Sequence, residues 1–215
     1  MKPALLVQAL FVVVASFAAF AFVRAARNDL LLTSCSAVCE LGPAYAGNDR
    51  LAPDFTLPDM NGRRVSLSSF AGQPVVLNFW TQSCEPCKKE LPSLGELAVL
   101  GRTHGFTVVT VSADDGPDDV RATLQSIFRG ADVPFPVLFD PELEVIHDKY
   151  GTSLYPETWI IDSSRIIRAR FDGERSWSAP LAREAIDMLS KSGGCRADFA
   201  NSAPVGPFAG LCPAH

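Results

Sequence analysis

The feature that most constrains the fold of this chain is a pair of cysteines, Cys84 and Cys87, placed directly after an apolar segment. That segment, residues 74–80, is nearly all apolar and predicts a strand buried on both faces. A helix is expected to begin at about Cys84, because apolar residues recur after it at helical spacing. Cys84 then lies at the helix N-terminus, where free N–H groups and the macrodipole stabilise a thiolate, and Cys87 lies one turn further on, close enough to attack a mixed disulfide. This arrangement predicts dithiol–disulfide chemistry.

The surrounding pattern, from residue 51 to residue 190, alternates strands with helices. Asn61 and Gly62 predict a hairpin turn near its start. Further strands are expected near residues 106–112, 137–139, 157–162 and 166–172, and further helices near residues 118–128, 140–150 and 179–190. Strands that alternate with helices predict an α/β layered fold.

A pair of cysteines can also bind zinc, which requires two more Cys or His ligands at comparable spacing. The sequence contains no second CxxC motif, and none of His104, His147 and His215 is suitably paired. We therefore expect no metal at this site, and no cofactor other than the redox-active disulfide itself.

The charge pattern argues against binding of nucleic acid. The chain has 19 Lys and Arg against 24 Asp and Glu, and a net charge of −5. A nucleic-acid surface requires clustered Lys and Arg. The tightest basic cluster, Arg165, Arg168 and Arg170, lies on a predicted strand and is interpreted as a solvated strand face.

The N-terminal segment, residues 4–23, is an apolar run interrupted only by Gln8 and Ser16. A helix of this length extends roughly 30 Å, which is enough to cross a hydrocarbon core. Two interpretations stay open: a signal anchor that forms one transmembrane helix, and a cleaved signal peptide. The length favours the anchor.

These patterns predict four parts of the chain. They are an anchor over residues 1–27, a linker over 28–50, a catalytic domain over 51–190 and a flexible, cysteine-containing tail over 191–215.

The stretch from Asn78 to Pro92, with the sequence NFWTQSCEPCKKELP, resembles the active-site stretch of membrane-anchored thioredoxin-like proteins of the TlpA/ResA type. That group includes the cytochrome c maturation reductases. Residues 52–57 resemble the opening strand of the family, and residues 150–158 resemble the loop that carries its cis-proline. The resemblance implies a thioredoxin-like fold. Such a fold has a central mixed sheet flanked by helices, an N-terminal hairpin extension and a helix–strand insertion.

The resemblance also implies roles for individual residues. Cys84 would be the attacking thiolate and Cys87 the resolving thiol, while Pro156 would be the cis-proline that shapes the groove for the target chain. Glu90 lies three residues after Cys87, on the same helix face, where a carboxylate raises a thiol pKa or relays a proton. Candidates for substrate contacts are Trp80 beside the dithiol, Tyr155, and Glu157, which with Glu85 would form an acidic rim.

Four cysteines remain as candidates for structural disulfides: Cys35, Cys39, Cys195 and Cys212. They allow three connectivities, of which we expect the sequence-local one, Cys35 with Cys39 and Cys195 with Cys212. Cys35 and Cys39 could instead relay electrons or bind copper. Six cysteines and an export signal indicate an oxidising compartment, so the catalytic domain is expected in the periplasm or another extracytoplasmic space.

The leading functional hypothesis is a thiol–disulfide oxidoreductase that reduces an exported partner, such as apocytochrome c or a metal-site protein, and receives electrons from a membrane donor. One alternative is a copper-handling module. Related copper-delivery proteins use CxxxC and a later-loop histidine, whereas this chain has CxxC and places His147 in a predicted helix. Another alternative is a thiol peroxidase. Residues 81–84 match TxxC, but Leu77 stands where the peroxiredoxin pattern has proline.

Overall fold

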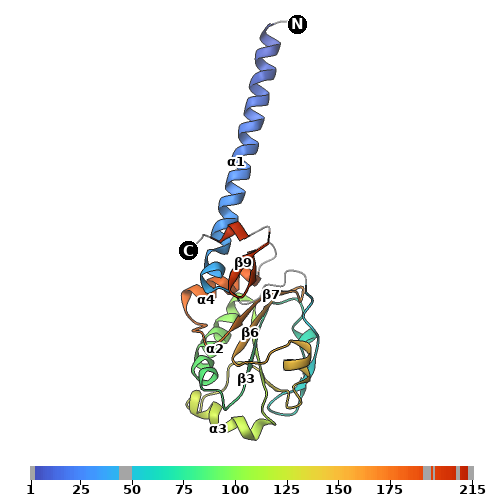
Figure 1. Cartoon of the computed structure of the whole chain (residues 1–215), viewed down its shortest axis with the longest axis vertical. Coiled ribbons are helices and arrows are strands. Elements are labelled where there is room, and N and C mark those ends of the chain that lie inside the picture. The colour runs from blue at the N-terminus through green and yellow to red at the C-terminus, as the bar shows by residue number, and fades with distance from the viewer. Residues whose placement is uncertain (1–2, 44–49, 191–194, 196, 207–208, 213–215) are drawn as a thin grey trace.

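The centre of the fold is strand β3 (Val75–Trp80), in which every residue is buried. It pairs in parallel with β4 (Thr107–Ser112) and antiparallel with β6 (Glu157–Ile161). With β5 (Val137–Phe139) and β7 (Ile167–Asp172), these strands form a five-stranded mixed sheet in the order β5-β4-β3-β6-β7. The mixed sheet confirms the predicted α/β, thioredoxin-like architecture (Figure 1).

The computed structural model describes residues 3–43, 50–190, 195, 197–206 and 209–212. Three helices pack on one face of the sheet: α2 (Glu85–His104), α3 (Pro117–Ile127) and α4 (Pro180–Ser190). The end of α1 (Pro3–Leu41) joins the same apolar cluster. Val76 and Trp80 of β3 point into this cluster, whereas Val75, Leu77 and Phe79 point into the cluster on the other face.

The second face of the sheet is covered by the N-terminal hairpin and two short helices. The hairpin pairs β1 (Thr56–Pro58) with β2 (Arg64–Ser66) across the predicted turn, and a short 3-10 helix, η1 (Leu67–Phe70), follows it. The second helix, η2 (Glu144–Lys149), forms π-helical turns. Helix α3 and strand β5 form the predicted helix–strand insertion between β4 and β6.

Helix η2 begins later than the predicted helix over residues 140–150. The carboxylate of Asp140 accepts hydrogen bonds from the backbone N–H groups of Val145 and Ile146, at 2.9 and 2.8 Å. Leu143, directly before η2, has a left-handed backbone with φ of 59°. The Asp140 carboxylate therefore caps the short helix η2, and the predicted longer helix does not begin at Asp140.

Helix α1 projects away from the domain and ends in contact with it (Figure 1). The predicted linker over residues 28–50 is helical over residues 28–41, because α1 continues to Leu41. The tail, predicted to be flexible, contains regular structure: β8 (Asp198–Ala200), β9 (Ala203–Val205) and a short helix, η3 (Ala209–Leu211). Residues 44–49 and 191–194 lie outside the described residues.

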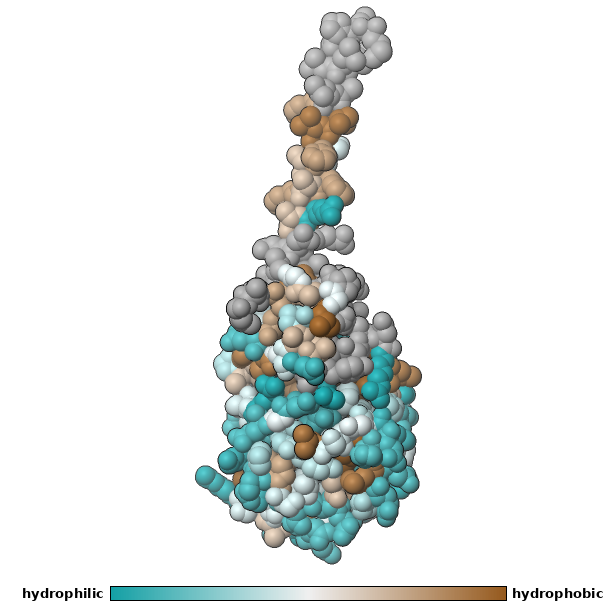
Figure 2. All heavy atoms as spheres, viewed as in Figure 1, coloured by the Kyte–Doolittle hydropathy of each residue, from teal (hydrophilic) through white to brown (hydrophobic). Residues whose placement is uncertain are grey.

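Apolar side chains are exposed along the described part of α1 (Figure 2). Phe11, Phe17 and Phe22 each have more than 70% of their surface exposed. Within the part of the chain that the structure describes, no helix has the length and apolarity needed to cross a membrane. The prediction of a transmembrane helix over residues 1–27 is therefore not confirmed.

The structural disulfides connect the two ends of the chain, in contrast to the predicted sequence-local pairing. Cys35 is bonded to Cys195, and Cys39 is bonded to Cys212. Cys35 and Cys39 lie one turn apart on α1, where Cβ atoms are about 5–6 Å apart, too far for a disulfide, which needs about 3.5–4.5 Å. The continuing helix, which the sequence pattern did not reveal, thus directs both thiols toward the tail.

We expect the double variant Cys39→Ala and Cys212→Ala to lower the free energy of unfolding. While the Cys35–Cys195 disulfide stays closed, the Cys39–Cys212 disulfide closes a further loop of about 20 residues in the unfolded chain. Its removal should therefore lower the free energy of unfolding by about 3 kcal/mol. Urea titration of the variant against the wild-type chain measures it. A midpoint equal to that of the wild type would show that the bridge does not stabilise the fold.

Candidate active site

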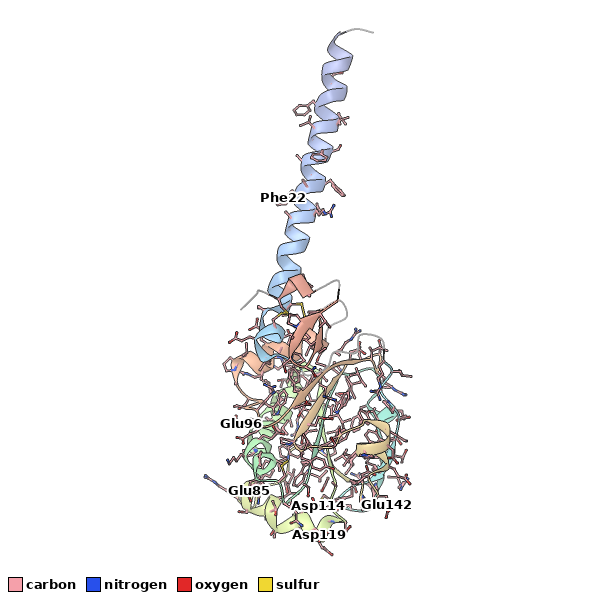
Figure 3. All side chains as sticks on the ribbon, in the orientation of Figure 1. Phe22, Glu85, Glu96, Asp114, Asp119 and Glu142 are labelled. Atoms are coloured by element: carbon pink, nitrogen blue, oxygen red, sulfur yellow. A yellow bond between two sulfur atoms is a disulfide. The ribbon has the colours of Figure 1, made fainter. Side chains whose placement is uncertain are left out.

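The dithiol lies at the N-terminus of α2, at the end of the domain far from α1, where Figure 3 labels Glu85. Cys84 is the N-cap residue of α2, and its Sγ accepts a hydrogen bond from the backbone N–H of Cys87 at 3.1 Å. Pro86 occupies the first turn, where its missing N–H has no helical partner to lose. The two sulfurs form a disulfide, and Cys84 is half-buried whereas Cys87 is completely buried. Cys84 is thus the thiol that a partner can reach.

The loop before Cys84 is held by Asp114, which follows β4 (Figure 3). The carboxylate of Asp114 accepts hydrogen bonds from Thr81 Oγ1 at 2.8 Å and from the backbone N–H of Gln82 at 2.9 Å. The backbone N–H of Cys84 in turn donates to the Thr81 carbonyl at 3.1 Å. The attacking sulfur therefore stands on a loop that is fixed to the neighbouring strand.

Glu90 is buried on α2, three residues after Cys87, with only 2% of its surface exposed. Its Oε1 accepts a hydrogen bond from Asn78 Nδ2 at 2.7 Å. Its Oε2 accepts from the backbone N–H of Arg175 at 3.1 Å and from Trp177 Nε1 at 3.2 Å. Residues three apart on a helix are neighbours on its surface, so this carboxyl and the buried thiol share one face of α2.

Burial raises the pKa of Glu90 to about 7. Hydrogen bonds from Arg175, Asn78 and Trp177 act in the opposite direction, and the negative charge of Glu174 adds to the rise. Removal from water disfavours a carboxylate unless enough donors replace the lost hydration. Glu90 can therefore take up or release a proton near neutral pH.

The loop before β6 contains the expected cis-proline. The peptide bond between Tyr155 and Pro156 is cis. Tyr155 packs against the apolar cluster that contains Cys87, and burial followed by the charges of Asp140 and Asp114 raises its pKa. Tyr155 of the cis-proline loop thus packs on the same apolar cluster as the buried thiol.

Glu157 does not contribute to an acidic rim, in contrast to the prediction. Only 6% of its surface is exposed, because it opens a strand in which every residue is buried. Its Oε1 accepts hydrogen bonds from Thr152 Oγ1 and from Trp159 Nε1, the latter at 2.7 Å. Arg170 lies on the other side of the carboxylate, at 3.8 Å from Oε2. The Glu157 side chain therefore forms its hydrogen bonds and its ion pair within the protein.

Trp80 likewise faces the core. It is completely buried among the residues that pack under α2, so the predicted substrate contact finds no support. Glu85 is exposed and forms an ion pair with Lys88 one turn further along α2. Of the two predicted rim residues, only Glu85 is therefore accessible to a partner.

Three residues that matter at this site are absent from the sequence prediction: Asn78, Asp114 and Trp177. Asn78 could have been identified from the sequence, because it is the one polar side chain within the buried apolar segment. Buried polar groups are normally hydrogen-bonded, so a partner could have been expected. Asp114 and Trp177 reach the site only through loops that follow β4 and β7, which no spacing rule reveals.

The candidate copper ligand His147 lies on η2 at the surface, beside Asp148 at 3.0 Å. Among the described residues, no group of three or more His, Cys, Asp or Glu side chains could hold a metal ion. The basic residues Arg165, Arg168 and Arg170 face Asp54, Asp162 and Asp172, respectively. They therefore take part in intramolecular ion pairs.

A thioredoxin-like sheet with a CxxC pair at the start of a helix defines a thiol–disulfide oxidoreductase. The chain belongs to the AhpC/TSA family, whose model matches residues 49–170. Thiol-disulfide oxidoreductase ResA of Bacillus subtilis is 33% identical over 146 residues, which cover 63% of this chain and 77% of that protein. ResA of Bacillus thuringiensis is 31% identical over 125 residues, which cover 58% of this chain and 69% of that protein.

Solved structures agree with this assignment. A Chlorobium tepidum protein described provisionally as thiol:disulfide interchange protein DsbE aligns with a TM-score of 0.59 and 28% identity, covering 67% of this chain and 99% of that one. A thiol:disulfide interchange protein from Chlorobium tepidum TLS aligns with a TM-score of 0.55 and 25% identity, covering 67% of this chain and all of the other. The present chain is thus a ResA-like thiol–disulfide oxidoreductase.

Proposed function

We propose that the protein reduces disulfides of an exported partner outside the cytoplasm, with apocytochrome c and metal-site proteins as the candidate substrates. The observation that carries this proposal is the asymmetry of the dithiol. Cys84 is partly exposed at the N-terminus of α2, whereas Cys87 is completely buried behind it. Only one sulfur can then meet the partner, and the other completes the reaction from within.

The reaction proceeds in two exchanges. The Cys84 thiolate attacks one sulfur of the target disulfide, forms a mixed disulfide, and releases the other target sulfur, which takes up a proton. Glu90, as a carboxylate, accepts the proton of the Cys87 thiol. The Cys87 thiolate then attacks Cys84, which closes the Cys84–Cys87 disulfide and releases the second target thiol. Two electrons pass from the dithiol to the target.

The buried carboxyl supports the direction of electron flow. A negative charge one turn from Cys87 disfavours ionisation of the dithiol, so the reduced form gains little stability from a thiolate. A strongly stabilised reduced form is what makes a disulfide oxidising. Glu90 therefore favours a protein that donates electrons, and a membrane donor would restore the dithiol after each cycle.

The other cysteines support the proposed compartment. Both structural disulfides join the ends of the chain, and no described cysteine is free. Disulfides of this kind persist in oxidising environments.

Pro156 and Tyr155 of the cis-proline loop would form the groove that receives the target chain beside Cys84.

The direction is tested with the full chain, reduced at Cys84 and Cys87, and an apocytochrome c whose haem-binding thiols form a disulfide. We expect stoichiometric reduction of the apocytochrome. Its free thiols are alkylated and counted by mass spectrometry to measure this reduction. The reverse assay offers the oxidised chain to a reduced, unfolded thiol protein. Faster oxidation of that protein than reduction of the apocytochrome would contradict the proposal.

A further inference from the structure

The loop between β7 and α4 covers the carboxyl of Glu90. Trp177 Nε1 and the backbone N–H of Arg175 both donate to Oε2, at 3.2 and 3.1 Å. Oε1 accepts from Asn78 of the central strand. One carboxyl oxygen is thus held by the sheet, and the other is held by this loop.

The loop is itself fixed to α2 and to the core. Ser93 Oγ accepts a hydrogen bond from the backbone N–H of Trp177 at 3.0 Å and donates to the Glu90 carbonyl at 2.8 Å. The Trp177 ring is completely buried and meets Phe171 edge-on, with ring centroids 5.5 Å apart. The indole N–H therefore has one fixed direction, which is toward Glu90.

We propose that Trp177 is a positioning residue for the dithiol reaction, because its indole N–H fixes the Glu90 carboxyl and sets how readily that group exchanges its proton with the thiols. A donor that binds the charged form of an acid favours that form. The inference rests on the proposed function, in which Glu90 serves as the proton acceptor for Cys87.

The other groups around Glu90 determine what a Trp177 variant changes. The loop contributes the negative Glu174 and the positive Arg175, whose guanidinium lies 5.1 Å from the Phe171 ring centre and is influenced by Asp172. The sheet contributes neutral side chains, Asn78 and Thr158, joined by a hydrogen bond of 2.9 Å. Helix α2 contributes Ser93 and the dithiol. Removing the indole N–H therefore alters one hydrogen bond and no charge.

The test compares Trp177→Phe with Trp159→Phe in the full chain. Trp159 is a matched control, because it is also buried and donates its indole N–H to a buried glutamate, Glu157, at 2.7 Å. Two readouts are measured against pH. They are the ¹³C resonance of the Glu90 carboxyl, assigned with Glu90→Gln, and the rate at which iodoacetamide alkylates Cys84 in the reduced protein.

We expect Trp177→Phe to raise the midpoint of the Glu90 titration by about one pH unit, since a hydrogen bond to a charged group is lost. The inflection of the alkylation profile near neutral pH should move by the same amount, and Trp159→Phe should move neither. Replacement of Trp177 by benzothienylalanine, which lacks only the N–H, gives the same comparison if phenylalanine disturbs folding.

Two results would overturn the inference, and they have different meanings. If Glu90→Gln alters the alkylation profile but the Trp177 variants leave the Glu90 midpoint unchanged, Trp177 has no positioning role and the proposed function stands. If Glu90→Gln leaves the alkylation profile unchanged, Glu90 does not act on the thiols, and the proposed role of this carboxyl fails together with the inference.

Discussion

Replacement of Cys84 by serine should lower the rate of target reduction by roughly 10³-fold or more, because a hydroxyl cannot form the mixed disulfide on which both exchanges depend. Cys84 is the member of the pair that is exposed to a partner, whereas Cys87 is completely buried. The rate is measured as the appearance of free thiols in an oxidised target peptide, with dithiothreitol as the electron source.

Cys87→Ser is the matched control for this variant. It keeps the attacking sulfur and removes the resolving one, so the mixed disulfide between Cys84 and the target should accumulate and be visible as a covalent adduct by mass spectrometry. Adducts formed by the Cys84→Ser variant through Cys87 would mean that the buried sulfur reaches the target, and the assignment of the two roles would be reversed.

Glu90→Gln should remove much of the dependence of stability on pH between about 4.5 and 7. Burial raises the pKa of Glu90 from its ordinary 4.5 to about 7, so the folded chain binds the extra proton in that interval and the unfolded chain does not. The stabilisation is complete below the unfolded value and is lost as pH rises through the folded one. The loss is on the order of 3 kcal/mol.

The structure can accommodate glutamine at this position. Asn78 Oδ1 is buried without a hydrogen-bond partner, and rotation of the Asn78 amide would turn that oxygen toward the new side-chain NH₂. Urea titrations at pH 5, 6, 7 and 8 compare the variant with the wild type. Glu96→Gln is the control, because Glu96 lies exposed on the same helix (Figure 3). Equal pH dependence in the Glu90 variant and the wild type would show that Glu90 titrates normally.

The central part of the fold could be predicted from sequence because its signals are local. The apolar segment before Cys84 leaves no polar face, so it has to be a strand covered on both sides, and Asn61 and Gly62 specify a hairpin turn without help from tertiary contacts. The place of Cys84 at the helix N-terminus followed from the same local pattern. The cis bond at Pro156 followed from the family resemblance.

The parts that sequence reasoning missed depend on contacts between distant segments. The disulfide pairs join residues 160 and 173 positions apart, and their pairing depends on how far α1 continues. The burial of Glu157 depends on Thr152 and Trp159. The hold on Glu90 depends on Trp177, which lies 87 residues further along the chain. Such partners are brought together by tertiary packing, which leaves no pattern among neighbouring residues of the sequence.

The most direct test of the account is the equilibrium reduction potential of the Cys84–Cys87 couple in the full chain. The chain is equilibrated in dithiothreitol or glutathione buffers, the free thiols are alkylated, and the fraction of modified Cys84 and Cys87 is measured by mass spectrometry, which separates this couple from the structural disulfides. A potential near or below about −250 mV, in the range of reducing thioredoxin-like proteins, is the predicted result. A potential near about −120 mV would make the protein a disulfide donor and contradict the proposed direction.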